Sequence, residues 1–135
     1  RMKSEGINVR LEFIRGVPSV DMKYLQVQAD IIVDQLYFGR YGAFAREAMM
    51  LGRPVVGRLH YDNEEDSETI ACLEECPIID ATPESLYGIL KELVIDVNKR
   101  EKLGQQSREF ALKWHSVRSC ADRFEQEYEV LLDEK

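Results

Sequence analysis

Long apolar runs, cysteines and histidines are all scarce in this 135-residue sequence. No stretch approaches the ~18–20 unbroken apolar residues that a membrane-spanning helix needs, and residues 1–6 lack the apolar segment of a signal peptide. The three cysteines are an odd number and are scattered, so we expect no disulfide framework and infer a reducing, cytoplasmic environment. Apolar residues nevertheless make up 44% of the chain, enough for the core of one compact domain over residues 1–135.

Potential metal ligands are also sparse. Cys72 and Cys76 would lie one turn apart in a helix, but no third cysteine and no histidine lies near them in the sequence. We therefore expect no metal site and interpret both residues as ordinary buried thiols. The acidic run at residues 62–68 lacks the glycine and the regular oxygen spacing of a calcium loop, so it predicts a solvated loop.

The net charge of −7 and the isoelectric point near 4.9 argue against nucleic acid as a partner. The charge is unevenly distributed: residues 1–60 carry nine basic and six acidic side chains, whereas residues 61–135 carry nine and nineteen. Between positions 35 and 61 the sole acidic residue is Glu47, and four arginines flank it in the sequence: Arg40, Arg46, Arg53 and Arg58. This basic stretch indicates where an anionic ligand would bind.

Apolar periodicity and turn residues predict alternating strands and helices. Short apolar or alternating runs predict strands at residues 9–14, 31–33, 55–57 and 77–80. Amphipathic segments predict helices at residues 20–28, 43–51, 70–75, 83–96, 98–113 and 117–132, with Ser19 and Thr82 as N-terminal caps. This order predicts an α/β fold, a parallel sheet with helices on both faces and a helical C-terminal tail.

In such a sheet, ligands bind outside the carboxyl ends of the strands, which here lead into residues 15–18, 34–42, 58–62 and 80–83. The second loop contains Gly39-Arg40-Tyr41-Gly42 directly before a helix that begins at Ala43. Its glycines allow close approach of the backbone, the helix N-terminus favours an anion, and Arg40 adds a cation. This arrangement fits a phosphate cradle and also fits a simple tight connection, since it lacks the spacing of dinucleotide-binding and P-loop motifs.

Glu47 lies one turn into the otherwise apolar helix that follows this loop. A carboxylate there must face solvent or bind a partner, because burying it unpaired is costly. It suits the two hydroxyl groups of a ribose and equally suits a surface ion pair with a nearby arginine.

Four sequence blocks share the spacing of a known pattern: Ala29-Asp30-Ile31-Ile32-Val33, Tyr41-Gly42, Glu47-Ala48-Met49 and Gly52-Arg53-Pro54-Val55-Val56. Together they resemble the donor-binding domain of the family 4 (group 1) retaining glycosyltransferases of the GT-B fold. The resemblance covers most of residues 7–131, and its most specific part runs from Glu47 to Val56.

The resemblance implies a Rossmann-like sheet, one half of a GT-B fold, that binds a nucleotide-diphosphate-sugar as substrate without a further cofactor. Glu47 would bind the ribose hydroxyls, and Gly42 with the amides of Tyr41, Ala43 and Phe44 would contact the diphosphate. The loop that contains Gly16 and Val17 would lie beneath the nucleobase. The resemblance further implies a role in polysaccharide or glycolipid assembly, in which any membrane contact is made by the full-length protein.

The sequence departs from the family at position 39, where the first glutamate of the family's paired motif is replaced by Gly39. That glutamate contacts the transferred sugar, so the residues present leave the sugar, the nucleobase and the acceptor open. No catalytic residue is evident, although His60 follows a strand that ends near the expected sugar position. The family's acceptor-binding N-terminal domain is absent from these residues, so we expect a fragment that is inactive alone.

Two other functions are compatible with the same elements. The replacement at position 39 is compatible with a nucleotide-sugar-binding domain that has lost catalysis. The strand–helix alternation also fits a receiver-like signalling module with Asp34 as phosphoacceptor. That module needs an acidic pair after its first strand and a lysine after a later one, where this chain has Arg15-Gly16 and Asp80-Ala81.

Overall fold

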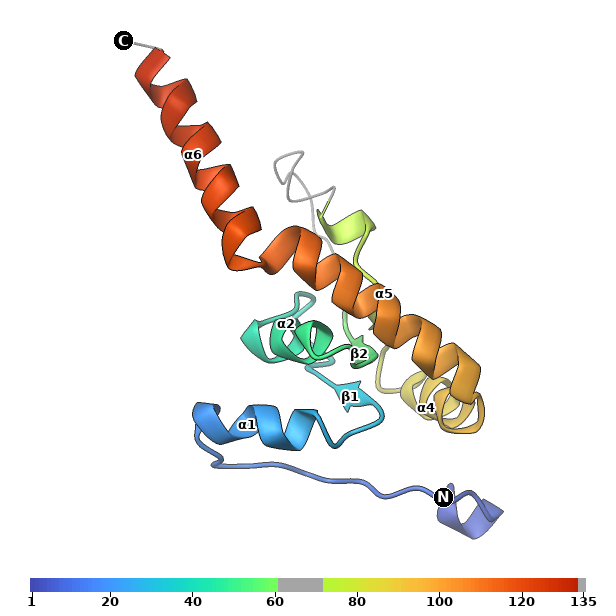
Figure 1. Ribbon diagram of the computed structural model, residues 1–135. Coiled ribbons are helices and arrows are strands. Elements are labelled where there is room, and N and C mark those ends of the chain that lie inside the picture. The colour runs from blue at the N-terminus through green and yellow to red at the C-terminus, as the bar shows by residue number, and fades with distance from the viewer. Residues whose placement is uncertain (61–71, 134–135) are drawn as a thin grey trace.

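The structure is a computed structural model, and it describes residues 1–60 and 72–133. A short 3₁₀ helix, η1, opens the chain, and helices and strands then alternate before a helical C-terminal part (Figure 1). The elements are η1 (Lys3–Glu5), α1 (Ser19–Gln26), β1 (Ile32–Val33), α2 (Ala43–Met50), β2 (Val55–Gly57), β3 (Ile79–Asp80), α4 (Leu86–Ile95), α5 (Val97–His115) and α6 (Val117–Asp133).

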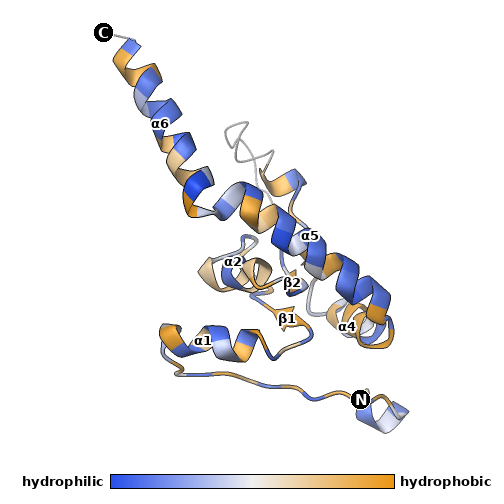
Figure 2. Cartoon of the chain, viewed as in Figure 1, coloured by the Kyte–Doolittle hydropathy of each residue, from blue (hydrophilic) through white to orange (hydrophobic). Residues whose placement is uncertain are grey.

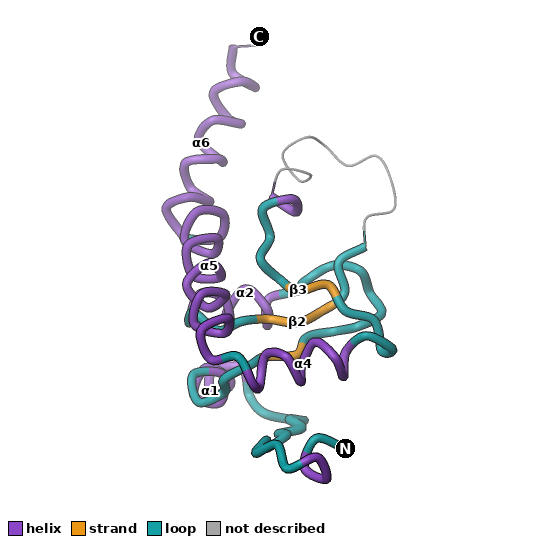
Figure 3. Tube along the Cα trace, turned by 90° about the vertical axis from the view of Figure 1, so that its right-hand side faces the viewer, coloured by secondary structure: helices purple, strands orange, loops and turns teal. Residues whose placement is uncertain are grey.

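The three strands form one parallel sheet in the order β1-β2-β3. Ile32 pairs with Val55, and Val56 pairs with Ile79, so neighbouring strands are in register over two residues each. Figure 3 shows β2 and β3 side by side, and α2 forms the crossover between β1 and β2. The predicted α/β class with a parallel sheet is confirmed.

Both faces of the sheet are covered by helices. Alternate residues of each strand point to opposite faces. Ile32, Val55 and Ile78 pack on one face with apolar residues of α2 and α5. On the other face Val56 packs with Leu93 of α4. The prediction of helices on both faces is therefore confirmed, and the near-continuous apolar strands follow from this double burial.

The predicted strand at residues 9–14 is wrong. Among the described residues no strand pairs with this segment, which runs extended past α1 (Figure 1). Its hydrophobic and hydrophilic residues alternate (Figure 2), but Leu11 is 81% exposed and Phe13 is 75% exposed. An alternating pattern becomes a strand only where a neighbour supplies the hydrogen bonds.

The helix starts were predicted with mixed success. Pro18, not Ser19, is the N-cap of α1, and that helix ends at Gln26 instead of residue 28. The predicted Thr82 cap is wrong, because α4 begins at Leu86 and its N-cap is Ser85. Thr82 and Ser85 instead bond to each other before the helix: the Thr82 amide donates to Oγ of Ser85 over 3.0 Å, and the Ser85 amide donates to Oγ1 of Thr82 over 3.4 Å. The reciprocal pair closes the turn that leads into α4.

The helical C-terminal tail is confirmed as α5 and α6, and α6 projects away from the rest of the fold (Figure 1). No residue of α6 is buried, although apolar side chains recur along one side at Val117, Phe124 and Leu131. Within residues 1–60 and 72–133, no helix combines the length and the hydropathy needed to cross a membrane.

Candidate functional site

Charged side chains occupy the carboxyl edge of the sheet, where ligands bind in parallel folds. Asp34 follows β1, Arg58 follows β2 and Asp80 ends β3. Nη1 of Arg58 donates to Oδ2 of Asp80 over 2.7 Å, and the Leu59 amide donates to the other oxygen over 2.8 Å. Oδ2 of Asp34 is buried and has no hydrogen-bond partner in the part of the chain that the structure describes. From the sequence, Asp34 was considered only as the phosphoacceptor of a receiver-like module. Its position directly after a buried strand could have identified it as a residue of the carboxyl edge.

The loop over residues 34–42 folds back onto the segment that follows β2. The Arg58 amide donates to the Gln35 carbonyl over 2.9 Å, and the His60 amide donates to the Gly39 carbonyl over 2.8 Å. The Gln35 side chain also donates to the Arg40 carbonyl, across the loop. These bonds fix the loop from both ends, so its backbone has one defined path.

Gly39 is required by that path. Its φ is +82°, and a β-carbon at this position would lie 3.0 Å from the His60 carbonyl oxygen. Residues other than glycine rarely adopt this backbone conformation, and the close approach of a β-carbon to the His60 carbonyl oxygen would add to the strain. The loop conformation therefore disfavours any side chain at position 39, including the glutamate found there in the family that the chain resembles.

The loop delivers the start of α2 to the carboxyl edge. Gly42 is the N-cap, with an extended backbone, and no described side chain caps the helix. The first N–H groups, those of Ala43, Phe44 and Ala45, thus lack a side-chain partner and form the positive end of the helix dipole. Nε2 of Gln26 donates to the Phe44 carbonyl over 2.9 Å, which holds α1 against this first turn.

Tyr41 points into the protein. Its hydroxyl oxygen lies 2.9 Å from Nε2 of His115 and 3.3 Å from Sγ of Cys72. Burial, followed by the contact with the Cys72 thiol, raises the pKa of Tyr41. The predicted role of Tyr41 through its backbone amide is compatible with this orientation, but its side chain belongs to the interior.

Glu47 lies on the exposed side of α2, opposite the buried Ala45, Ala48 and Met49. Among the residues described, no hydrogen bond or ion pair holds its carboxylate, so the surface ion pair expected as its alternative role is not formed there. Glu47 and the uncapped N-terminus of α2 are therefore presented by one rigid helix.

The four arginines of the basic stretch divide into two groups. Nη2 of Arg53 donates to the Val27 carbonyl over 2.7 Å, and Arg58 is paired with Asp80, so both have structural partners. Arg40 on the loop and Arg46 in the first turns of α2 are exposed beside the candidate site. Arg53 and Arg58 thus serve the fold, and the expectation that the whole stretch serves an anion is not met by these two residues.

The loop at residues 15–18 lies at the start of α1. Gly16 has a φ of +65° and is exposed, and Val17 is partly buried. Because α1 leads into the amino end of β1 and α2 leaves its carboxyl end, both helices begin on the same side of the sheet (Figure 1). Gly16 and Val17 are thus placed on the side of the candidate site, although among the described residues no hydrogen bond joins them to Gly42.

Two exposed aromatic residues at the loop tip were missed from the sequence. Tyr37 is 87% exposed and Phe38 is 75% exposed, two and one residues before Gly39. Exposed aromatic rings beside an anion cradle can stack on a base or a sugar. Their position in the glycine-containing loop before α2 was the signal that could have identified them.

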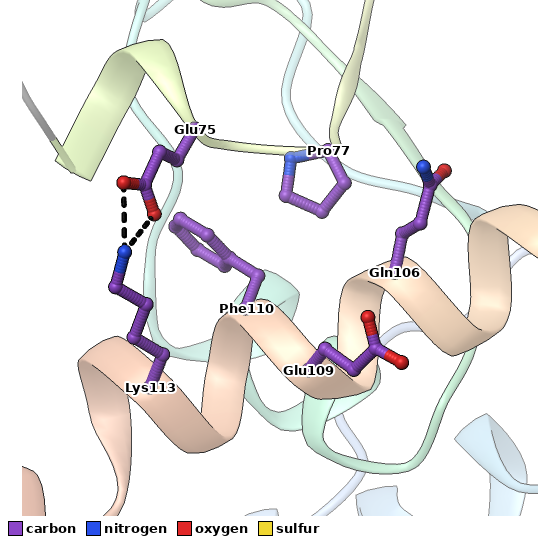
Figure 4. A pocket seen from close by; sticks show the side chains of 6 residues that line it. All are labelled: Glu75, Pro77, Gln106, Glu109, Phe110 and Lys113. Atoms are coloured by element: carbon purple, nitrogen blue, oxygen red, sulfur yellow. Dashed lines mark hydrogen bonds and ion pairs between the residues drawn. The ribbon is translucent and has the colours of Figure 1, made fainter.

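A separate shallow groove of about 420 Å³ lies between α5 and the segment before β3 (Figure 4). Phe110 and Pro77 form its apolar part, and Lys113 bridges to Glu75 over 2.7 Å. The hydrogen bond from Lys113 lowers the pKa of Glu75, and Nε1 of Trp114 donates to the same carboxylate. The charged groups of this groove therefore satisfy one another and leave no evident ligand chemistry.

All three cysteines are free thiols, and the described residues contain no group of three or more His, Cys, Asp or Glu side chains arranged to hold a metal ion. The acidic run at residues 62–68, interpreted above as a solvated loop, lies outside the described part of the chain.

Comparison with known proteins finds no matching family, no similar curated protein and no similar solved structure. The resemblance to glycosyltransferases therefore rests on the residues of the chain itself, chiefly the block from Glu47 to Val56.

Proposed function

We propose that this chain is the donor-binding half of a retaining glycosyltransferase and that it binds a nucleotide-diphosphate-sugar at the start of α2. The single observation that carries the proposal is the uncapped N-terminus of α2, delivered by a glycine loop to the carboxyl edge of a parallel sheet. The fold would then be the Rossmann-like half of a GT-B enzyme, whose acceptor-binding domain belongs to the full-length protein.

The diphosphate is assigned to the first turn of α2. Its amides supply hydrogen-bond donors and the helix dipole supplies positive potential, and both favour a bound anion. Arg40 and Arg46 are exposed on the loop and on the helix, where they can neutralise the remaining charge. During transfer the same groups would stabilise the negative charge of the departing diphosphate.

The nucleoside is assigned to the neighbouring side of the same edge. The carboxylate of Glu47 lies exposed on α2, less than two turns beyond the diphosphate amides, and a carboxylate accepts two hydroxyl hydrogen bonds. Gly16 and Val17 at the start of α1 would lie beneath the base. One helix thus sets the spacing between the diphosphate and the ribose.

Calorimetric titration with UDP and GDP, each compared with uridine or guanosine, tests this assignment. We expect one of the two nucleoside diphosphates to bind and its nucleoside to bind at least about 10-fold more weakly, because charge-assisted hydrogen bonds to the diphosphate are lost. Equal affinity for nucleoside and nucleoside diphosphate, or no binding of either diphosphate, would contradict the proposal.

A second function, binding of the nucleotide-sugar without transfer, is favoured by the conformation of Gly39. The backbone at this position disfavours the carboxylate that contacts the sugar in the family that the chain resembles. A transfer assay on the full-length protein separates the two functions: donor turnover supports the enzyme, and tight donor binding without turnover supports the binding domain.

A further inference from the structure

A half-buried polar contact joins the glycine loop to the far end of α5. Tyr41 lies 74 residues before His115, yet its hydroxyl oxygen is 2.9 Å from Nε2 of the imidazole. Cys72, in the short helical segment before β3, places its Sγ 3.3 Å from the same oxygen. Three segments that are distant in sequence therefore meet at one hydroxyl group.

Aromatic packing restricts the orientation of these groups. The rings of Tyr41, Phe110 and His115 form three mutual edge-on contacts, with centroid distances of 6.2, 5.6 and 5.5 Å and interplanar angles of 73°, 68° and 74°. Edge-on pairs at these distances are favourable and directional. Phe110 itself is buried in the core, so Tyr41 is held against a rigid part of α5.

The donors and acceptors form one consistent chain. Burial, together with the nearby Arg46 and Arg123, lowers the pKa of His115 to about 4, so the imidazole is neutral at pH 7. A neutral imidazole accepts one hydrogen bond, and we assign this bond from the Tyr41 hydroxyl to Nε2, with the imidazole proton on Nδ1. In this assignment the Tyr41 oxygen accepts from the Cys72 thiol.

Tyr41 is adjacent in sequence to the groups assigned to the diphosphate. It directly precedes Gly42, the N-cap of α2, and the Gly42 carbonyl accepts the Arg46 amide over 3.2 Å. It also follows Gly39, whose carbonyl accepts the His60 amide. A side chain anchored between these two glycines limits the conformations of the loop before any ligand arrives.

We propose that Tyr41 and His115 form a latch that holds the loop and the first turn of α2 in the anion-binding conformation, which makes His115 a positioning residue of the site. The inference rests on the proposed function for its ligand. The latch lowers the conformational entropy that the loop would lose when a diphosphate binds, which is the usual benefit of preorganisation.

The first test needs no ligand. We compare Tyr41→Phe and His115→Phe, which keep the rings but remove the hydrogen bond, with His115→Gln, which keeps an acceptor, and with Tyr128→Phe on exposed α6 as control. Amide hydrogen exchange of Arg46 and His60 reports the loop, since their acceptors are the carbonyls of Gly42 and Gly39. We expect about 3- to 10-fold faster exchange in the two Phe variants at positions 41 and 115, partial rescue in His115→Gln and no change in Tyr128→Phe.

Unchanged exchange at these two amides in Tyr41→Phe would overturn the latch. A uniform loss of protection that includes Leu93 in the core would also overturn it, because the role would then be one of general stability. In the wild type, the ¹⁵N resonances of His115 at pH 7 should show a protonated Nδ1 and an unprotonated Nε2, and the opposite tautomer would contradict the hydrogen-bond direction.

The second test measures affinity for UDP and GDP. We expect Tyr41→Phe and His115→Phe to weaken binding of whichever diphosphate binds by about 3- to 10-fold, with the double variant no weaker than either single one. If the wild type binds a diphosphate and both variants bind it with the same affinity, the positioning role is overturned. If the wild type binds neither diphosphate, the proposed function fails, while the exchange measurement still decides whether the latch exists.

Discussion

Gly39 connects the sequence of this chain to the chemistry proposed for it. The residue adopts a left-handed backbone, and a β-carbon there would lie 3.0 Å from the His60 carbonyl oxygen. A glutamate there would strain the loop that presents α2, so the sequence change at position 39 and the loop conformation are two aspects of one feature. Under the proposed function, sugar contacts would come from other residues; one carboxylate at the same edge is Asp34, whose Oδ2 is buried and has no hydrogen-bond partner among the described residues.

Replacing Gly39 tests this interpretation. Gly39→Ala should lower the free energy of unfolding by about 1–2 kcal/mol, because alanine must adopt a positive φ and contact His60. Gly88→Ala in α4 is the matched control, since a β-carbon there meets nothing within 4 Å and should stabilise the helix by about 0.5–1 kcal/mol. Urea denaturation measures both, and a Gly39→Ala variant as stable as the wild type would refute the strained-loop interpretation.

His115 predicts a pH dependence of stability. Its pKa is lowered to about 4 in the folded chain by burial and by Arg46 and Arg123, against an ordinary value near 6.5. Between pH 6.5 and 4 the unfolded chain therefore binds a proton that the folded chain does not, so the wild type loses stability as the pH falls. Above pH 7 this contribution is constant, because the imidazole is neutral in both states.

His115→Gln should remove this part of the pH dependence. Denaturation midpoints of the wild type and of the variant should differ by a constant amount above pH 7 and should converge between pH 6.5 and 4. If the two denaturation midpoints differ by the same amount at every pH from 4 to above 7, His115 titrates normally in the folded protein.

At the scale of elements, α5 is positioned by a contact between two glycines. A β-carbon on Gly104 would lie 2.4 Å from the Gly52 carbonyl oxygen, in the turn that ends α2. This approach lets Phe110 and Ala111 of α5 pack with Ala48 and Met49 of α2 in the same core. The spacing of α2 and α5, and hence the position of His115 relative to Tyr41, depends on this absence of side chains.

Gly104→Ala should therefore lower the free energy of unfolding by about 1–3 kcal/mol, because the helices must separate. The control is Glu101→Ala, about one turn earlier on the exposed side of α5. It should change the free energy of unfolding by less than about 0.5 kcal/mol. Urea denaturation provides the comparison, and equal midpoints would show that α5 moves freely away from Gly52.

Most elements of the whole molecule could be predicted, because their signals are local. The apolar runs of β1 and β2 depend on neighbours within a few residues, and each strand was placed within one position. The N-cap of α4 was placed three residues too early, at Thr82 instead of Ser85. The segment at residues 9–14 was wrongly predicted as a strand, since a strand needs a partner that an alternating pattern does not specify.

The candidate site was predictable to the same extent. The glycine loop and the start of α2 follow from local signals, and Glu47 is exposed on the predicted helix. The inward orientation of Tyr41 and the structural partners of Arg53 and Arg58 depend on residues 74, 26 and 22 positions away, respectively. Such contacts are set by packing of the whole molecule, which no local pattern encodes.

Titration of the wild type and of Glu47→Ala with UDP and GDP tests the central claim most directly. The wild type should bind one of the two, and Glu47→Ala should weaken that binding by about 10- to 100-fold, because a charged acceptor of the ribose hydroxyls is lost. Glu101→Ala should leave the affinity unchanged. Binding of neither nucleotide, or binding that survives Glu47→Ala unaltered, would contradict a nucleotide-sugar site at the start of α2.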